Sequence, residues 1–320
     1  MALQQRLEDS LFSYHSTAAE VVTGMDLVGE TAVVTGGYSG IGTETVRALV
    51  SAGAQVIVGA RRLEVAQENL RDIAGVTILP LDLGEPASID TFSEAVLSRT
   101  TQLDILINNA AIMANPLTRD SRGFESRFAV NHLGHFQLTA RLFPLLISTR
   151  NARVVVLTSS AHSGNGLEIN DLNFESRAYE KWTAYSQAKS ANALFALSLD
   201  KIGEPHGVRA FAVDPGAIDT PLQRHMTDED KVAIGWMDKE GNLNPLLKTV
   251  KQGASTTLWC ATSPLLNDIG GVYCENCNIA EPWKAGNPPM TGVHPHVCDE
   301  ALADALWIKS EELLGEKFPI

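Results

Sequence analysis

Short, continuously apolar runs separated by longer helical stretches are the feature that most constrains the fold of this chain. The run Arg153–Thr158, for example, holds four consecutive apolar residues and does not alternate with polar ones. Strands that are covered on both faces have this pattern, which is typical of a parallel sheet with helices above and below it. The sequence therefore predicts a doubly wound α/β fold of about seven strands. The predicted strands are 31–35, 55–59, 77–81, 105–107, 153–158, 208–213 and 271–273, and the predicted helices lie near 41–52, 63–74, 86–100, 122–148, 183–202, 246–262 and 299–314.

The predicted elements form one domain. A chain of 320 residues with 44% hydrophobic residues suits a single large α/β domain, and no repeat or clean linker divides it. We expect residues 1–25 to form a polar N-terminal arm and residues 26–320 to form the domain. The segment 214–250 is rich in Pro, Gly, Asp and Lys and is too long for a plain connector, so it is predicted to be a lid or substrate loop.

Charge and composition exclude several classes of function. The 25 basic and 38 acidic residues give a net charge of −13, which disfavours binding to nucleic acid or anionic lipid. Four cysteines do not suggest a disulfide scaffold and favour a reducing compartment. The first thirty residues contain no apolar signal core, and no stretch approaches the ~18 apolar residues of a membrane span. We expect a cytoplasmic protein.

A glycine-rich turn joins the first predicted strand to the first long helix. The sequence there is Thr35-Gly36-Gly37-Tyr38-Ser39-Gly40-Ile41-Gly42. Glycines allow tight backbone geometry and close approach of a phosphate, and the helix N-terminus offers free N–H groups and a positive dipole end. The position after an apolar strand predicts a Rossmann-type dinucleotide site, as opposed to a plain turn. The predicted cofactor residues here are Gly36, Tyr38, Ser39, Gly40, Ile41 and Gly42.

The Thr-Gly-x-x-x-Gly-x-Gly spacing resembles the cofactor turn of the short-chain dehydrogenase/reductase family, and the resemblance spans roughly residues 26–280. It implies two further cofactor segments. An Asp at the end of the third strand would contact the adenine ring, although it could equally cap the next turn. An Asn-Asn-Ala-Gly-like segment after the fourth strand would pack beside the adenosine ribose, with Ala in place of the commoner Gly. The residues concerned are Asp82 and Leu83, then Asn109, Ala110 and Ala111.

The end of the second strand predicts which nicotinamide cofactor binds. The position where the family places an acidic residue is Ala60, and Arg61 and Arg62 follow. A carboxylate would repel a 2′-phosphate, whereas a guanidinium can bind it through paired hydrogen bonds. We therefore predict NADP(H) over NAD(H), the alternative being that both arginines form a solvated helix start.

Tyr185 and Lys189 lie four residues apart in a strong helical stretch, which places phenol and ammonium on one face. Free tyrosine has a pKa of ~10 and is a sluggish acid at neutral pH. A neighbouring lysine, like the positive charge of oxidised nicotinamide, is expected to lower that pKa. The pair therefore predicts proton transfer coupled to hydride transfer.

The family resemblance supplies the remaining catalytic residues. The fifth strand ends in Thr158-Ser159-Ser160, and by the motif's register Ser160 matches the serine that binds the substrate oxygen, with Ser159 second. The predicted catalytic tetrad is Asn131, Ser160, Tyr185 and Lys189. Lys189 would also bind the nicotinamide ribose together with Tyr185. The Pro-Gly-x-x-x-Thr pattern after the sixth strand implies nicotinamide contacts from Pro215, Gly216, Ile218 and Thr220.

The interval between Ser160 and Tyr185 is longer than in many family members and contains Asp171-Leu172-Asn173-Phe174. Together with the segment 16–20, this resembles the retinol dehydrogenase-like branch, whose members act on apolar alcohols, aldehydes and ketones. We expect an oxidoreductase that transfers hydride between NADP(H) and an apolar ketone, aldehyde or secondary alcohol. We also expect no membrane partner, and a homo-oligomer (dimer or tetramer) remains open.

Several alternatives compete with this interpretation. Cys274 and Cys277 have a zinc-ligand spacing, and a zinc site could also draw on Cys298, His294 and His296. However, Cys274 lies in a predicted buried strand and no second such cysteine pair exists, so we expect no metal. His132 and His135 flank Asn131 and are expected to be packing or surface residues, not catalytic ones. A nucleotide-sugar epimerase or dehydratase shares Ser-Tyr-Lys, and a regulator that senses NADP without turnover would share the fold.

Overall fold

The computed structural model describes residues 5–287 and 291–320, so the first four residues of the predicted arm lie outside it. The strands form a single eight-stranded sheet in the order β3-β2-β1-β4-β5-β6-β7-β8. The first seven strands pair in parallel, and β8 pairs antiparallel with β7. The predicted doubly wound sheet is confirmed, and the eighth strand was missed because it has only two residues. The strands are β1 (Thr31–Thr35), β2 (Gln55–Ala60), β3 (Val76–Pro80), β4 (Ile105–Asn108), β5 (Ala152–Leu157), β6 (Val208–Asp214), β7 (Val272–Glu275) and β8 (Asn278–Ile279).

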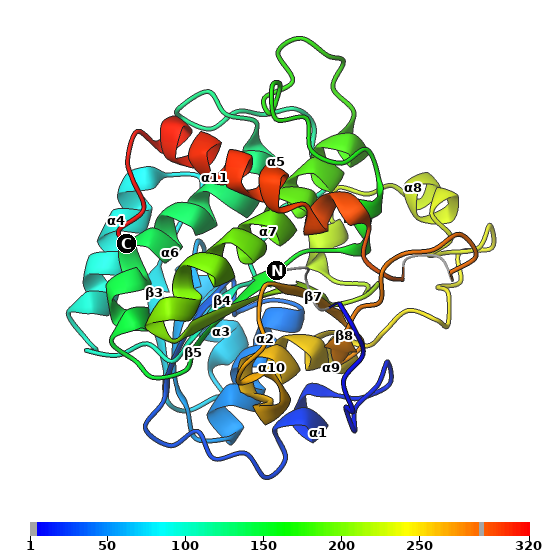
Figure 1. Cartoon of the computed structure of the whole chain (residues 1–320). Helices are drawn as coiled ribbons and strands as arrows, with labels where there is room; N and C mark the ends of the chain where they lie inside the picture. Colours follow the sequence, from blue (N-terminus) through cyan, green and yellow to red (C-terminus); the bar gives the residue numbers. More distant parts are fainter. Residues whose placement is uncertain (1–4, 288–290) are drawn as a thin grey trace.

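Helices cover both faces of the sheet (Figure 1). Neighbouring residues of β1 face opposite layers: Val33 belongs to one buried cluster, whereas Ala32 and Val34 belong to the other. Because both faces are buried, every position of such a strand must be apolar, which explains the continuous apolar runs in the sequence. The layer with α1 (Ala18–Val22), α2 (Ile41–Ser51), α3 (Leu63–Leu70) and α10 (Ser255–Thr262) lies opposite the layer with α4 (Pro86–Leu97), α6 (Gly134–Ile147), α7 (Lys181–Gly203) and α11 (Glu300–Leu314).

The strand order opens a crevice at the centre of the sheet. β1 lies between β2 and β4, with Val34 opposite both Val58 and Ile107. The chain leaves β1 toward β2 on one side and returns to β4 on the other, so the loops after β1 and β4 diverge. Open α/β sheets bind ligands at such a switch point, outside the carboxyl ends of the strands.

The segment predicted as one helix over 122–148 is divided. It contains the short helix α5 (Ser126–Phe128), a π-helix (η1, Ala129–Leu133) and then α6. Wide turns of this kind are common at functional sites, because they rearrange the backbone hydrogen bonds locally. Asn131, one of the predicted catalytic residues, lies in the middle of this turn.

The ends of the chain are packed onto the domain. Within the predicted arm, α1 is capped by reciprocal hydrogen bonds between Thr17 and Glu20 and packs against α10. At the other end, α11 packs against α7. The segment 214–250 holds only a short 3₁₀ helix (η4, Pro221–Gln223) and α8 (Asp228–Ala233), before α9 (Val250–Gly253). No helix in the described ranges is both long and apolar enough to cross a membrane.

Gly134 allows the first turn of α6 to lie against the loop after β3. A Cβ atom at Gly134 would lie 2.4 Å from the carbonyl oxygen of Leu83, whereas one at Gly84 would meet nothing nearer than 3.4 Å. We predict that Gly134→Ala lowers the free energy of unfolding by about 1–3 kcal/mol in denaturant titration, because a backbone clash outweighs the helix propensity of Ala. Gly84→Ala is the control and should change it by less than ~1 kcal/mol. Equal effects of the two substitutions would contradict the packing described here.

Candidate active site

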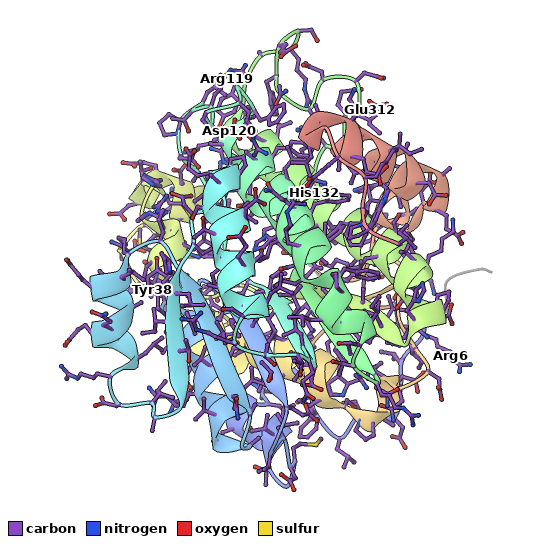
Figure 2. All side chains as sticks on the ribbon, turned by 90° about the vertical axis from the view of Figure 1, so that its left-hand side faces the viewer. Arg6, Tyr38, Arg119, Asp120, His132 and Glu312 are labelled. Carbon is purple, nitrogen blue, oxygen red and sulfur yellow. The ribbon has the colours of Figure 1, made fainter. Side chains whose placement is uncertain are left out.

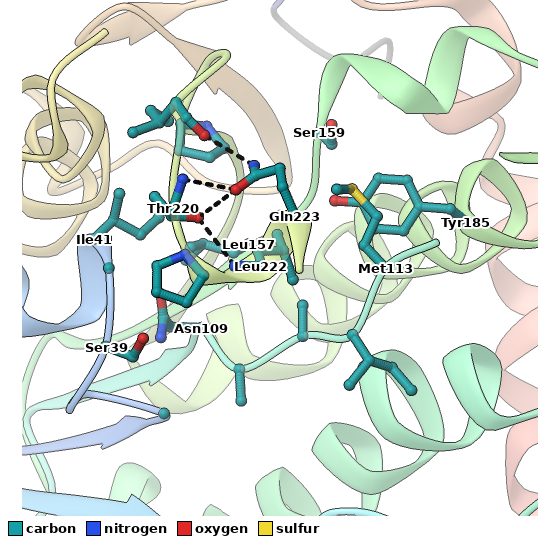
Figure 3. A pocket seen from close by; sticks show the side chains of 18 of the residues that line it. Ser39, Ile41, Asn109, Met113, Leu157, Ser159, Tyr185, Thr220, Leu222 and Gln223 are labelled. Carbon is teal, nitrogen blue, oxygen red and sulfur yellow. Dashed lines mark hydrogen bonds between the residues drawn. The ribbon is translucent and has the colours of Figure 1, made fainter. Parts of the chain in front are cut away.

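A cavity of about 560 Å³ lies at the carboxyl ends of the strands (Figure 3). Ser39 and Ile41 of the glycine turn lie on one side of it, and Tyr185 lies on the other. Of the predicted cofactor residues, all but Gly42 line this cavity. The predicted cofactor residues that line the cavity are Gly36, Tyr38, Ser39, Gly40, Ile41, Arg61, Arg62, Asp82, Leu83, Asn109, Ala110, Ala111, Tyr185, Lys189, Pro215, Gly216, Ile218 and Thr220.

The glycine turn has the geometry of a phosphate site. Gly36 and Gly40 have φ angles of 62° and 55°, in the region that favours glycine. No side chain caps the N-terminus of α2, so its positive dipole end remains available to a ligand, while the N–H groups of Gly42 and Thr43 donate at 3.2 Å to the carbonyls of Ser39 and Gly40. Gly42 packs beneath the turn, where a Cβ atom would lie 2.6 Å from the Gly36 carbonyl oxygen. The turn therefore fits the pyrophosphate of a dinucleotide.

The hydroxyl of Thr35 joins the glycine turn to the end of β4. Its Oγ1 accepts the backbone N–H groups of Asn109 and Ala110, both at 2.9 Å. In return the Asn109 side-chain Nδ2 donates to the Thr35 carbonyl at 2.7 Å. The two loops that border the crevice are thus held together by one buried side chain.

His135 extends this connection to the π-helix. Its Nδ1 lies 2.9 Å from the Asn131 carbonyl oxygen, and its Nε2 lies 2.8 Å from Thr35 Oγ1. Burial lowers the pKa of His135 to about 4, so the ring is neutral. A carbonyl can only accept, so Nδ1 carries the proton and Nε2 accepts from the Thr35 hydroxyl. His135 is therefore a positioning residue, not a surface histidine.

His132 has a packing role. Burial lowers its pKa to about 3, and its Nε2 lies 2.8 Å from the Ser310 hydroxyl of α11. Figure 2 shows it among the helices, where it is buried, and it is not one of the residues that line the cavity.

Asn131 does not line the cavity; it holds a residue that does. Its Oδ1 accepts the Ile112 N–H at 2.9 Å, and its Nδ2 donates to the Ile112 carbonyl at 3.1 Å. The Asn131 side-chain amide thereby bonds both main-chain polar groups of Ile112, which lies in the loop after β4. Asn131 therefore fixes the position of Ile112, which lines the cavity.

Tyr185 and Lys189 are both buried on α7. Lys189 Nζ donates to the Leu157 carbonyl at 2.9 Å and lies 5.7 Å from the centroid of the Tyr185 ring. Burial lowers the pKa of Lys189 to about 8, an effect that the nearby Asp214 carboxylate opposes.

The sequence led us to expect that Lys189 lowers the pKa of the Tyr185 phenol, but in the structure this pKa is raised. Burial raises the Tyr185 pKa well above its ordinary value; a hydrogen bond to Ser159 opposes this, and the charge of Asp214 adds to it. The cost of burying a phenolate outweighs the attraction of the lysine, whose ammonium is engaged with a main-chain carbonyl. The buried phenol is therefore held protonated.

Ser159, the second choice of the sequence analysis, lines the cavity, and its side chain opposes the rise of the Tyr185 pKa. Ser160 also lines the cavity, but it begins the 3₁₀ helix η2 (Ser160–Ser163). Ser159 also accepts the Ala161 N–H at 3.2 Å, which caps that helix and orients the hydroxyl. Ser159 is therefore a candidate for binding the substrate oxygen beside Ser160.

The substrate side of the cavity is apolar, and sequence reasoning missed most of it. Side chains from four loops and helices pack around Tyr185: Met113, Ala161, Trp182, Leu222 and Met226. Trp236 also lines the cavity, as considered from the sequence, whereas Met237 and Leu243, considered with it, pair with each other through a β-bridge and are not among the lining residues. No motif marks these residues, because distant loops bring them together.

The polar end of the cavity carries exposed arginines. Arg61 and Arg62 lie at its edge after β2, and Arg224, which no motif marks, joins them from the segment after η4. Asp82 lines the cavity and also accepts the Gly84 N–H at 3.0 Å, so it caps its own turn. In the part of the chain that the structure describes, no group of three or more His, Cys, Asp or Glu residues is placed to hold a metal ion.

Comparison with known proteins gives a consistent result. The family described as short chain dehydrogenase matches residues 30–231. A probable oxidoreductase of Streptomyces lividans is 42% identical over 291 residues, which cover 88% of this chain and 97% of that protein. Human retinol dehydrogenase 12 is 36% identical over 92% of this chain and 89% of its own. The crystal structure of an uncharacterized protein from Mycobacterium paratuberculosis matches with a TM-score of 0.74 and 33% identity, over 96% of this chain and all of that one.

Removing the Thr35 hydroxyl should leave the Ala110 N–H and His135 Nε2 without partners, and should leave the Asn109 N–H with only the Ile107 carbonyl at 3.0 Å. We predict that Thr35→Val lowers the free energy of unfolding by at least about 2 kcal/mol, since each unpaired buried group costs ~1–3 kcal/mol. Thr45→Val is the matched control, because the Thr45 hydroxyl is equally buried but bonds only to the Ile41 carbonyl of its own helix. That substitution should cost less than ~1 kcal/mol. Similar small losses in both variants would show that the Thr35 connection is dispensable.

Proposed function

The chain belongs to the short-chain dehydrogenase/reductase family of NAD(P)-dependent oxidoreductases, and we propose that it interconverts apolar carbonyls and alcohols with NADP(H). The observation that carries the proposal is the cavity itself. One end of it has the phosphate-binding turn, and the other has the buried Tyr185, Lys189 and Ser159 among apolar side chains. A regulator without turnover would not need the second set. The retinol dehydrogenase-like branch expected from the sequence is confirmed by relatives that include retinol dehydrogenase 12.

In the reduction, Ser159 and Tyr185 bind the carbonyl oxygen. The side chain of Ser159 opposes the rise of the Tyr185 pKa, and both residues line the cavity. A carbonyl oxygen placed between them would accept from both. Aimed donors of this kind stabilise the negative charge that develops on oxygen in the transition state.

Tyr185 supplies the proton that the new alcohol requires. Its raised pKa keeps it protonated at neutral pH, which is the state a proton donor needs. When bound, NADPH supplies the hydride. Lys189 holds the nicotinamide ribose hydroxyls, and the same lysine stabilises the phenolate left after proton transfer. Thr220 and the main chain near Ile218 bind the carboxamide.

The role of Asn131 is to keep this geometry. Through Ile112 and His135 it connects the π-helix to the loops beside the cofactor turn. The tetrad is therefore proposed as Asn131, Ser159, Tyr185 and Lys189, with Ser159 in place of Ser160.

Two arginines support NADP(H) over NAD(H). Arg61 and Arg62 are exposed at the cavity edge, at the end of β2 where the ribose 2′ position lies in Rossmann-type sites. A guanidinium there would bind a 2′-phosphate through charge-assisted hydrogen bonds.

The substrate loop, assembly and location complete the proposal. Residues 214–250 form the substrate loop of the domain 26–320, and residues 1–25 form its N-terminal arm. The loop is tied to α7 by an ion pair of 2.6 Å between Lys181 and Asp230. We further propose that the protein is cytoplasmic and that it forms a homo-oligomer.

The proposed roles separate the two serines. Tyr185→Phe should lower kcat for NADPH-dependent reduction of apolar ketones and aldehydes by about 10²–10⁴-fold, because it removes the proton donor. Ser159→Ala should lower kcat by about 10²-fold or more, because one oxyanion donor is lost. Ser160→Ala should remain within a few-fold of the parent enzyme. A panel of aromatic, aliphatic and steroid-like carbonyls, followed by NADPH absorbance, provides the assay. If Ser160→Ala lowers kcat more than Ser159→Ala does, Ser160 is the serine that binds the substrate oxygen, as the sequence predicted. Near-normal turnover of Tyr185→Phe would refute the mechanism.

The pKa of Lys189 predicts a pH dependence. Since kcat/KM for NADPH reports groups of the free enzyme, it should fall as pH rises through about 8, where Lys189 loses its charge. Lys189→Arg keeps a positive charge over the whole range, so its profile should lack this decline even if the variant is slower. A flat profile of the parent enzyme up to pH ~10, the ordinary range of lysine, would contradict the assignment.

A further inference from the structure

A third arginine lies at the polar end of the cavity, where the sequence predicted two. Arg61 and Arg62 follow β2, whereas Arg224 comes from the substrate loop, more than half the chain away. All three side chains are exposed and line the same cavity. Residues far apart in the sequence thus line the same cavity.

The three guanidinium groups are not neutralised by the protein. Among the residues that the structure describes, none of them has a carboxylate within salt-bridge distance, although the chain has 38 acidic residues and Lys231 of the same loop pairs with Asp219. Arg224 donates at 3.0 Å to the Pro221 carbonyl of its own turn. The charges of Arg61 and Arg62 add to burial in lowering the Arg224 pKa. Like charges gathered without a partner favour the binding of an anion.

The position of Arg224 is fixed by the turn that precedes it. Thr220 and Gln223 form reciprocal hydrogen bonds: the Thr220 N–H donates to Gln223 Oε1 at 2.7 Å, and the Thr220 hydroxyl caps Leu222. Gln223 Nε2 donates at 2.9 Å to the Ile218 carbonyl. The Thr220 side chain also lies against the glycine turn, 3.3 Å from where a Cβ of Gly40 would be. Arg224 therefore directly follows a turn that these hydrogen bonds hold in place and that lies against the glycine turn.

Two anionic groups of a dinucleotide could meet this cation. The N-terminus of α2 would bind the pyrophosphate, on the side where Thr220 lies against Gly40. Arg224 instead shares the cavity edge with Arg61 and Arg62, which follow β2 on the ribose side of the site and whose charges lower its pKa. We propose that Arg224 binds the 2′-phosphate of NADP(H) from the loop side, opposite Arg61, and so makes closure of the substrate loop depend on which cofactor is bound. The inference rests on the proposed preference for NADP(H).

This assignment gives the cofactor an influence on the substrate pocket. Leu222 and Met226 flank Arg224 in the sequence, and both pack near Tyr185. A 2′-phosphate that draws Arg224 inward also seats these two apolar side chains. NAD(H), which lacks that phosphate, would leave the loop without this contact.

Equilibrium binding tests the assignment without turnover. The full-length protein is titrated with NADP⁺, with NAD⁺ and with adenosine 2′,5′-bisphosphate by calorimetry. Arg224→Gln should weaken NADP⁺ and the bisphosphate by about ten- to a hundredfold, as expected for loss of a charged hydrogen bond, and should leave NAD⁺ within about twofold. Arg224→Lys should recover part of the loss. Lys239→Gln, which removes a positive charge from an exposed loop position outside the cavity, should change none of the three affinities.

The Arg61 and Arg224 variants distinguish an error in the proposed cofactor preference from an error in the proposed role of Arg224. Arg61→Gln should weaken NADP⁺ selectively; if it does not, the proposed cofactor preference is wrong. If Arg61→Gln behaves as expected but Arg224→Gln binds NADP⁺ as the parent does, only the role of Arg224 is overturned. Equal weakening of NADP⁺ and NAD⁺ by Arg224→Gln would place Arg224 on the pyrophosphate and would also overturn it. Unfolding curves of all variants establish that each is folded.

Discussion

The buried hydroxyl of Thr35 is the contact on which the geometry of the site depends. It receives two backbone N–H groups from the loop after β4 and gives its own proton to His135. Through that imidazole the cofactor turn is connected to the π-helix that carries Asn131. Buried polar groups are tolerable only when every partner is present, so the same network that stabilises the crevice also fixes its shape.

Burial gives the catalytic pair its chemical state. The low dielectric around Tyr185 opposes ionisation of the phenol, and the same surroundings bring the pKa of Lys189 down to about 8. The chain without cofactor therefore presents a protonated donor beside an ammonium that is charged at neutral pH. In this account the hydrogen bond from Ser159 and the charge of an oxidised nicotinamide are what ease proton loss, more than the lysine. Asp214 works against that loss and is a buried carboxylate that sequence patterns did not mark.

The sequence predicted the sheet, and all but one of the cofactor residues that it proposed line the cavity, because both predictions rest on local patterns. A continuous apolar strand followed by glycines specifies its own turn, and Tyr185 and Lys189 share a helix face through their spacing alone. The choice between Ser159 and Ser160 stays a prediction, because one residue of register decides which hydroxyl faces inward, and motif spacing does not resolve it. Arg224 and Trp182 could not be found, since only the folding of distant loops over the strands brings them to the cavity. The effect of Lys189 on Tyr185 was misjudged for a related reason: burial, the dominant cause, cannot be read from spacing.

The most direct test of the account is the ionisation of Tyr185 itself. NMR of protein with ¹³C-labelled tyrosine, titrated without cofactor and assigned by the signal lost in Tyr185→Phe, reports this phenol among the chain's five tyrosines. The account predicts that Tyr185 is still protonated at pH ~11, where an ordinary tyrosine is about nine-tenths ionised. Ser159→Ala should make the phenol harder still to ionise, and Ser160→Ala should not. Ionisation of Tyr185 at or below the ordinary pKa of ~10 would contradict the central claim that burial holds the proton in place for transfer.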